Sequence, residues 1–311
     1  MTKNVKSNYL SAFYVSFAAS LWAFDGIIFR PFLYNLQVPF VVFLETIIVT
    51  IILSPLALKY KSVLKSLKFK DWLSFFGVAV FGGAVGTMAI TKALFYVDFI
   101  NLSIVVFIQK LQPVFAITLA ALLLKEKLTK SFIIWSVIAI IGAYIVAFGF
   151  NLPVIGTVSK TLEATLYALL AAFSFGASTI LSKRALRNVS FELGTYLRFS
   201  VTSIIMFLIV VFSSSFESID IISKSQIMVL FLIAFSTGGP AILLYYYGLK
   251  NLNASVAAIC ELAFPLMAVI LEYFFHDKIL SPFQWIGAII LILSILKVSG
   301  INFYYFRKQN H

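Results

Sequence analysis

Five ionisable residues interrupt long apolar stretches of the sequence, namely Asp25, Glu45, Lys110, Arg198 and Glu261. A charge at the centre of a membrane helix costs roughly 2.5 to 3.5 kcal/mol on insertion scales, so each of them needs a partner or a function. Ionisable groups within membrane segments commonly mark the paths of solutes and ions. These five residues are therefore our candidates for contact with a solute.

Glu261 is the strongest candidate because it lies one helical turn before Pro265, on the same face of the helix. Gln109 and Lys110 stand at the corresponding place before Pro113. One hypothesis is that Glu261 and Lys110 form an ion pair that only lets two buried charges share one location. The other is that these side chains face a cavity and contact a solute or a proton. The two hypotheses overlap, since a charged solute can compete for such a pair.

Glu45 and Arg198 occupy equivalent positions in the two halves of the sequence, with an acid in one half and a base in the other. They form either structural contacts or gating contacts made on alternate sides of the membrane. Asp25 is either a hydrogen-bonded acid near the outer interface or, with Trp22 and Phe29, part of a pocket for an organic cation. Three acids against two bases favour cationic or zwitterionic solutes such as amino acids or amines.

Motifs of catalysis are absent from the sequence. His276 and His311 are the only histidines, and no HExxH, GxSxG or GxxxxGK[ST] pattern occurs. Cys260 is the only cysteine, which excludes a multi-cysteine metal site. We therefore expect no enzyme, no cofactor and no metal, and an ATP-driven pump would need another subunit.

The segments that carry the candidate residues have the length of membrane spans. With 61% hydrophobic and 12% charged residues, the chain is not a soluble globular domain. A spanning helix needs about 20 mostly apolar residues, and backbone groups in hydrocarbon require helices here. The sequence thus predicts an all-α integral membrane protein with ten transmembrane helices, at residues 10–29, 38–58, 72–94, 100–124, 132–150, 163–181, 192–212, 227–247, 254–275 and 283–299.

The chain contains an internal repeat, with residues 1–150 as one five-helix copy and 151–311 as the other. Three residues recur at a shift of 152, namely Asn101, Ser103 and Pro113, then Asn253, Ser255 and Pro265. Because five is odd, the second copy enters the membrane in the opposite direction. Such inverted repeats are frequent in secondary transporters, which bind solute near the midplane, often at interrupted helices. We expect Pro113 and Pro265 to bend their helices.

Small residues cluster in the third and eighth spans, at 82–86 and at 236–240. They let helices approach closely, and they serve either packing alone or also leave room for a cavity. Tyr245, Tyr246 and Tyr247 are interpreted as an interfacial belt at the cytoplasmic end of the eighth span.

Basic residues are distributed unequally over the connections. If the N-terminus is cytoplasmic, the inner segments carry 17 basic residues and the outer segments five, Arg30, Lys92, Lys160, Lys224 and Lys278. The positive-inside rule therefore predicts a cell-membrane protein with both termini in the cytoplasm. The net charge of +12 is attributed to basic residues that set the orientation of the chain and face anionic lipid, and not to a nucleic-acid site.

Leu-Gln-Pro at 111–113 and Ala-Phe-Pro at 263–265 stand at matching places in the two five-span copies. With these motifs, residues 10 to 299 resemble the EamA-type drug/metabolite transporters. Each half also ends its fourth span with an acid and a short turn, at 125–129 and 277–279. The base often seen in the second span of such halves is present as Arg198 but replaced by Glu45 in the first half. The resemblance implies a ten-helix bundle with a central cavity and alternating access.

The leading functional hypothesis is a secondary transporter of a small organic metabolite, coupled to protons or to exchange. The alternative is a channel or a structural membrane protein. A channel is expected to show a filter-like loop or a ring of charges, and neither is found in the sequence.

Overall fold

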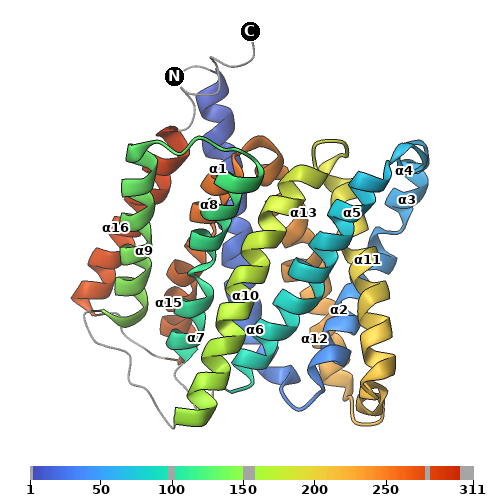
Figure 1. Ribbon diagram of the computed structural model, residues 1–311. Coiled ribbons are helices and arrows are strands. Elements are labelled where there is room, and N and C mark those ends of the chain that lie inside the picture. Colours follow the sequence, from blue (N-terminus) through green and yellow to red (C-terminus); the bar gives the residue numbers. More distant parts are fainter. Residues whose placement is uncertain (1–2, 97–101, 150–157, 277–280, 302–311) are drawn as a thin grey trace.

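The regular structure of the chain is helical (Figure 1). The computed structural model describes residues 3–96, 102–149, 158–276 and 281–301. Within these residues eight helical segments are long and apolar enough to span a membrane, and the shorter apolar helices Val38–Leu53 and Phe107–Leu123 bring the number to ten. Large apolar side chains such as Phe13, Ile204 and Ile289 are exposed, as suits a surface that faces lipid. The predicted all-α membrane fold is confirmed.

The first repeat is built from five spans, several of which change helical form along their length. Its elements are α1 (Lys3–Phe24), η1 (Asp25–Phe29), η2 (Arg30–Leu33), α2 (Val38–Leu53), α3 (Pro55–Lys59), α4 (Lys61–Ser66), α5 (Phe69–Val78), η3 (Ala79–Val85), α6 (Gly86–Leu94), α7 (Leu102–Gln109), α8 (Gln112–Leu123) and α9 (Lys130–Phe148). The second span ends at Leu53, earlier than the predicted Leu58, because Pro55 begins a separate short helix.

The second repeat follows the same order. Its elements are α10 (Val158–Ala185), α11 (Phe191–Phe212), η4 (Ser215–Ile219), α12 (Lys224–Ile233), η5 (Ala234–Gly238), α13 (Gly239–Asn251), α14 (Ala254–Cys260), α15 (Ala263–His276) and α16 (Pro282–Ile301). Side-chain caps fix several helix starts, since the hydroxyls of Thr129 and Ser190 accept hydrogen bonds from the backbone N–H groups of Phe132 and Leu193. Asn101, Phe150 and the turn at 277–279 lie outside the described residues, as do the side chains of Ser103 and His276.

Interruptions occur at matching places in the two repeats. The third span contains the π-helical segment η3 and the eighth contains η5, at the two runs of small residues. The fourth span breaks between Gln109 and Gln112, and the ninth between Cys260 and Ala263. π-helical turns and broken helices leave backbone groups without their usual partners and often occur at functional sites.

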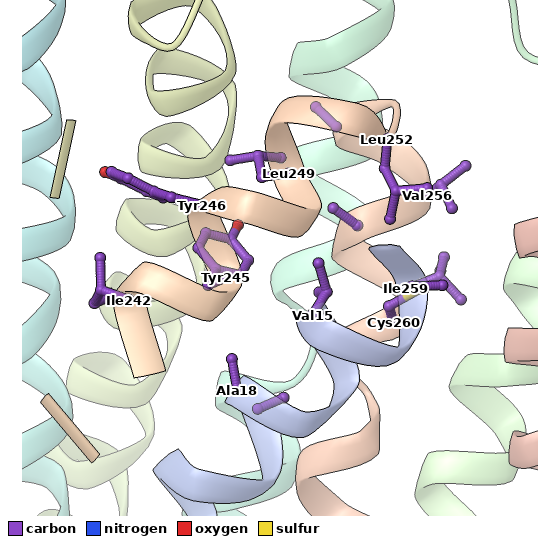
Figure 2. Packing of buried hydrophobic residues seen from close by; sticks show 14 of the residues in the cluster. Val15, Ala18, Ile242, Tyr245, Tyr246, Leu249, Leu252, Val256, Ile259 and Cys260 are labelled. Carbon is purple, nitrogen blue, oxygen red and sulfur yellow. The ribbon is translucent and has the colours of Figure 1, made fainter. Parts of the chain in front are cut away.

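The spans close to the centre pack tightly against one another. Figure 2 shows Val15 and Ala18 of α1 beside Tyr245 and Leu249 of α13, in the largest buried apolar cluster. The approach depends on Gly248, where an added Cβ would lie 2.5 Å from the carbonyl oxygen of Ser11. At one side of the bundle α9 and α16 pack against each other, and they also contact α1, α7, α14 and α15 (Figure 1). The remaining eight spans surround the centre.

Candidate functional site

A cavity lies between the two repeats, lined by residues of spans one to four and six to nine. Among the described residues, α9 and α16 contribute nothing to its wall. Its volume is about 190 Å³, counted as space for the centres of water molecules. One water needs roughly 10–15 Å³ on that measure, so the cavity has room for roughly 13 to 19 waters. This is the space of a small organic solute and not of a single ion.

Glu261 stands at the break between α14 and α15 and is fully engaged by hydrogen-bond donors. One carboxylate oxygen accepts from Gln112 Nε2 at 2.6 Å, and the other accepts from the hydroxyl of Tyr245 at 2.8 Å and that of Thr179 at 3.5 Å. Glu261 is 5% exposed, so these donors replace water around its charge. The carboxylate therefore joins the fourth, sixth, eighth and ninth spans at one end of the cavity.

Gln109 and Lys110 stand at the break between α7 and α8 and line the same cavity. They are 6% and 5% exposed, so both side chains are buried in the cavity wall. The Lys110 ammonium lies 3.8 Å from the ring centre of Phe264, a cation–π contact. An ammonium donates hydrogen bonds and a glutamine amide both donates and accepts them, so these two side chains bring polar groups to the cavity wall.

Asp25, Arg30 and Glu45 form a second charged group in the cavity wall. Arg30 Nη2 lies 2.5 Å from Asp25 Oδ2 and Arg30 Nη1 lies 2.9 Å from Glu45 Oε1, while Nη1 also donates to Thr91 Oγ1 at 3.3 Å. The arginine and Glu45 are buried, at 6% and 8% exposed. One guanidinium thus holds two carboxylates, which gives the group a formal charge of −1.

Arg198 is anchored to the π-helical segment of the third span. Its Nη2 donates to the carbonyl oxygen of Gly82 at 3.2 Å, and the hydroxyl of Thr87 donates to the same oxygen at 3.0 Å. Its Nη1 donates to the hydroxyl of Tyr246 at 3.5 Å. The Arg198 guanidinium and the Thr87 hydroxyl thus both donate to the Gly82 carbonyl of the π-helical segment η3. Arg198 lies in α11 and lines the cavity.

All six predicted contact residues line this one cavity, namely Asp25, Glu45, Gln109, Lys110, Arg198 and Glu261. Two proposed partnerships are not formed. Among the described ion pairs, Glu45 pairs with Arg30 and not with Arg198, and Lys110 makes no ion pair with Glu261. The two prolines are not part of the cavity wall. They lie at the helix breaks, with Pro113 at the start of α8 and Pro265 at the start of α15.

The sequence reasoning missed two residues of the cavity wall and misjudged one group. Arg30 was assigned to an outer connection, but the span continues through η1 and η2 and buries it. Adding Arg30 makes three acids and three bases in the cavity wall, so the basis for an amine or amino-acid solute is lost. Gln112 was quoted only as part of a motif. The tyrosine belt is wrong, because Tyr245 and Tyr246 are buried and Tyr245 binds Glu261.

The two repeats are also tied together away from the cavity. Glu126, after α8, accepts hydrogen bonds from the backbone N–H groups of Ala254 and Ser255 at 2.9 and 3.2 Å and from the Ser255 hydroxyl at 2.5 Å. The carboxylate thereby caps the N-terminus of α14. Elsewhere the Tyr96 hydroxyl donates to Glu163 at 2.8 Å, which raises the pKa of Tyr96.

Comparison with known proteins connects this geometry to a family. The model of the EamA-like transporter family matches twice, over residues 10–148 and 162–300. The riboflavin transporter ImpX of Fusobacterium nucleatum subsp. nucleatum is 46% identical over 292 residues, which cover 94% of this chain and 98% of that protein. An uncharacterized transporter of Synechocystis is 25% identical over 239 residues, 75% of this chain and 67% of its own length.

The fold has a counterpart among solved structures. One crystal structure superposes with a TM-score of 0.69 at 16% identity and covers 96% of this chain and 99% of the other. The identity is too low to carry more than the fold. The family model matches both halves, however, and the relatives are named transporters. The chain is therefore a multi-pass membrane protein that belongs to the EamA-like transporter family.

Proposed function

We propose that the chain is a secondary transporter of riboflavin, or of a solute with the same flat heteroaromatic ring, and that it works by alternating access. The observation that carries this proposal is the cavity wall, which combines aromatic side chains with buried polar atoms that have no hydrogen-bond partner among the described residues. The 46% identity to a protein named a riboflavin transporter points to the same solute.

The aromatic part of the wall suits a flat ring. Trp22, Phe175, Tyr245 and Phe264 all line the cavity, and the rings of Trp22 and Tyr245 lie 5.3 Å apart. Aromatic side chains favour offset-stacked and edge-to-face contacts with other rings. A flavin ring inserted among them would bury a large apolar area while the membrane-facing surface stays unchanged.

The polar groups of the wall suit the edge of that ring. The pyrimidine part of a flavin presents a carbonyl, an N–H and a second carbonyl in a row. A glutamine amide can pair with a carbonyl and the N–H, and an ammonium can donate to the other carbonyl. We assign these contacts to Gln109 and Lys110, because both side chains are buried in the cavity wall and can donate hydrogen bonds. The equal number of acids and bases also suits a neutral solute.

Alternating access is supported by how the two halves share the cavity. Four spans of each repeat line it, and both repeats contribute a broken helix that carries a polar side chain. Transporters with such repeats move one half against the other around a fixed site. We also propose that both termini are cytoplasmic, from the unequal basic residues of the connections.

The experiment that tests this function is equilibrium binding of riboflavin to the purified protein, followed by quenching of flavin fluorescence. Saturable quenching is expected, and an amino-acid and amine panel should not compete. Lys110→Met should weaken binding by tenfold or more without unfolding the protein, because it removes a buried ammonium that takes part in neither of the ion pairs found among the described residues. Lys92→Met is the matched control, since Lys92 is outside the cavity wall. Absence of saturable quenching by the wild-type protein would refute the proposal.

A further inference from the structure

The group formed by Asp25, Arg30 and Glu45 has more acceptors than donors. Asp25 Oδ1 is buried and, among the described residues, accepts no hydrogen bond. Glu45 Oε1 lies 2.9 Å from Arg30 Nη1, but this ion-pair contact lacks the alignment of a hydrogen bond. An unsatisfied buried acceptor costs about 1–3 kcal/mol, and more when it is charged. The group therefore needs donors that the described side chains do not supply.

The position of the group shows where such donors would come from. All three residues line the cavity, and Thr87 and Thr91 of α6 line it with them. Arg30 stands in η2, beyond the π-helical segment η1, and donates to Thr91 in the last turn of α6. Arg30 and its partner Glu45 are thus held beside η2 and α6, whereas Tyr245 packs against Trp22 and binds Glu261. The cavity has an aromatic end and a charged end.

The chemistry of the charged end matches a chain of hydroxyl groups. Each hydroxyl has one donor and two acceptor lone pairs. Carboxylate oxygens accept from hydroxyls, and the arginine and threonine side chains can donate to them. A second cation would satisfy the charge but would not use the arginine, and an apolar group would leave the oxygens unpaired.

We infer that Asp25, Arg30 and Glu45 bind the polyhydroxyl chain of the transported solute while its ring occupies the aromatic end. This inference rests on the proposed function and names the part of the solute that each end of the cavity recognises. For riboflavin the chain is the ribityl group, which carries four hydroxyls. The charged end then selects flavins that carry the chain over flavins that lack it.

The test compares riboflavin with lumiflavin, which has the same ring system and a methyl group in place of the ribityl chain. Binding of each flavin is measured by fluorescence quenching on the wild-type protein and on Asp25→Asn. This variant keeps the side-chain shape and leaves the Arg30 to Glu45 pair intact. Hydrogen bonds to charged groups imply a loss of about 10- to 100-fold in riboflavin affinity. Lumiflavin affinity should change less than twofold, and its binding also reports that the variant is folded.

The outcomes separate this inference from the proposed function. If the wild-type protein binds neither flavin, the proposed function fails and the inference fails with it. If it binds both flavins equally well, or if Asp25→Asn weakens both by the same factor, the function stands and the inference is overturned. Should Asp25→Asn bind neither flavin, Glu45→Gln decides in the same way, with a selective loss of riboflavin supporting the inference and an unselective loss overturning it.

Discussion

Replacing Arg30 by methionine tests whether one guanidinium neutralises two carboxylates inside the membrane. The substitution keeps the length of the side chain and removes the cation that pairs with Asp25 and Glu45. Breaking a buried ion pair by removing one partner costs about 3–5 kcal/mol. The side chains of Arg30 and Glu45 are only 7% and 10% exposed, so water does not replace the lost cation. We therefore expect a loss of stability within that range.

Protonation of a carboxylate limits the loss of stability in Arg30→Met and makes this loss depend on pH. Adding a proton at pH 7 to a carboxyl group of ordinary pKa, about 4, costs about 4 kcal/mol at 1.36 kcal/mol per unit. In Arg30→Met the folded state can neutralise a carboxylate in this way, whereas the unfolded chain is ionised. The folded variant then binds more protons than the unfolded one, so its stability falls as the pH rises. The deficit against wild type should be smaller at pH 5 than at pH 7.5, by up to about 3 kcal/mol.

The assay is thermal unfolding of the purified protein in detergent. At about 2–4 °C per kcal/mol, a loss of 3–5 kcal/mol lowers Tm by roughly 6–20 °C at pH 7.5. The triple variant Asp25→Asn, Arg30→Met, Glu45→Gln removes all three charges and should recover most of the loss, because a buried ionic group can be replaced by neutral side chains at little cost. A Tm of Arg30→Met within 2 °C of wild type, or a triple variant no more stable than the single one, would refute the reasoning.

Three further predictions follow from the packing, the cap and the charge distribution. Gly82→Ala should lower the free energy of unfolding by about 1–3 kcal/mol, because the new methyl group would overlap the Ser178 side chain of the sixth span. Gly26→Ala is the control and should be tolerated, since the nearest atom to its methyl group is at 3.9 Å. Equal losses of stability in the two variants would contradict this prediction. Glu126→Gln should lower stability by about 0.5–2 kcal/mol, since it weakens the cap of α14, and an unchanged Tm would contradict it. With Arg30 buried, the basic residues number 17 inside against 4 outside, that is five less one, so alkaline phosphatase fused after Lys65 or at the C-terminus should be inactive; activity at either position would reverse the orientation.

The cost of burying charge explains why the sequence located the cavity. Asp25, Glu45, Lys110, Arg198 and Glu261 interrupt apolar segments, and each could be stable only with partners or in a polar space. All five line the same cavity in the structure. Residue type and position were therefore enough to predict residues that line the cavity.

The partners within the site could not be predicted in the same way. Pseudo-symmetry gives the depth of Glu45 and Arg198 in the membrane but not the direction in which each helix is turned, which depends on packing. Arg30 follows an apolar run that ends at Phe29, so it reads as a connection, yet η1 and η2 carry the span further. Cys260 neighbours Glu261 in sequence, but it packs beside α1 (Figure 2). Its sulfur lies 3.6 Å from the Ser299 hydroxyl.

The site's remaining members lacked any signal that distinguishes them in a single sequence. Gln112 and Tyr245 belong to residue types that are common in helices and at membrane interfaces. Their role follows only from the fold, which brings both side chains to the carboxylate of Glu261. The small-residue runs indicated close packing, while the π-helical turns within them became visible only in three dimensions.

Counterflow in reconstituted vesicles is the most direct test of the central claim that the chain carries a flavin through the cavity between its halves. Vesicles are loaded with unlabelled riboflavin and diluted into a trace of labelled riboflavin. The account predicts transient accumulation of label above equilibrium. Glu261→Gln should reduce it strongly, since the variant loses the charge that holds Gln112 and Tyr245 at the end of the cavity. Label that rises no higher in wild-type vesicles than in protein-free vesicles would contradict the account.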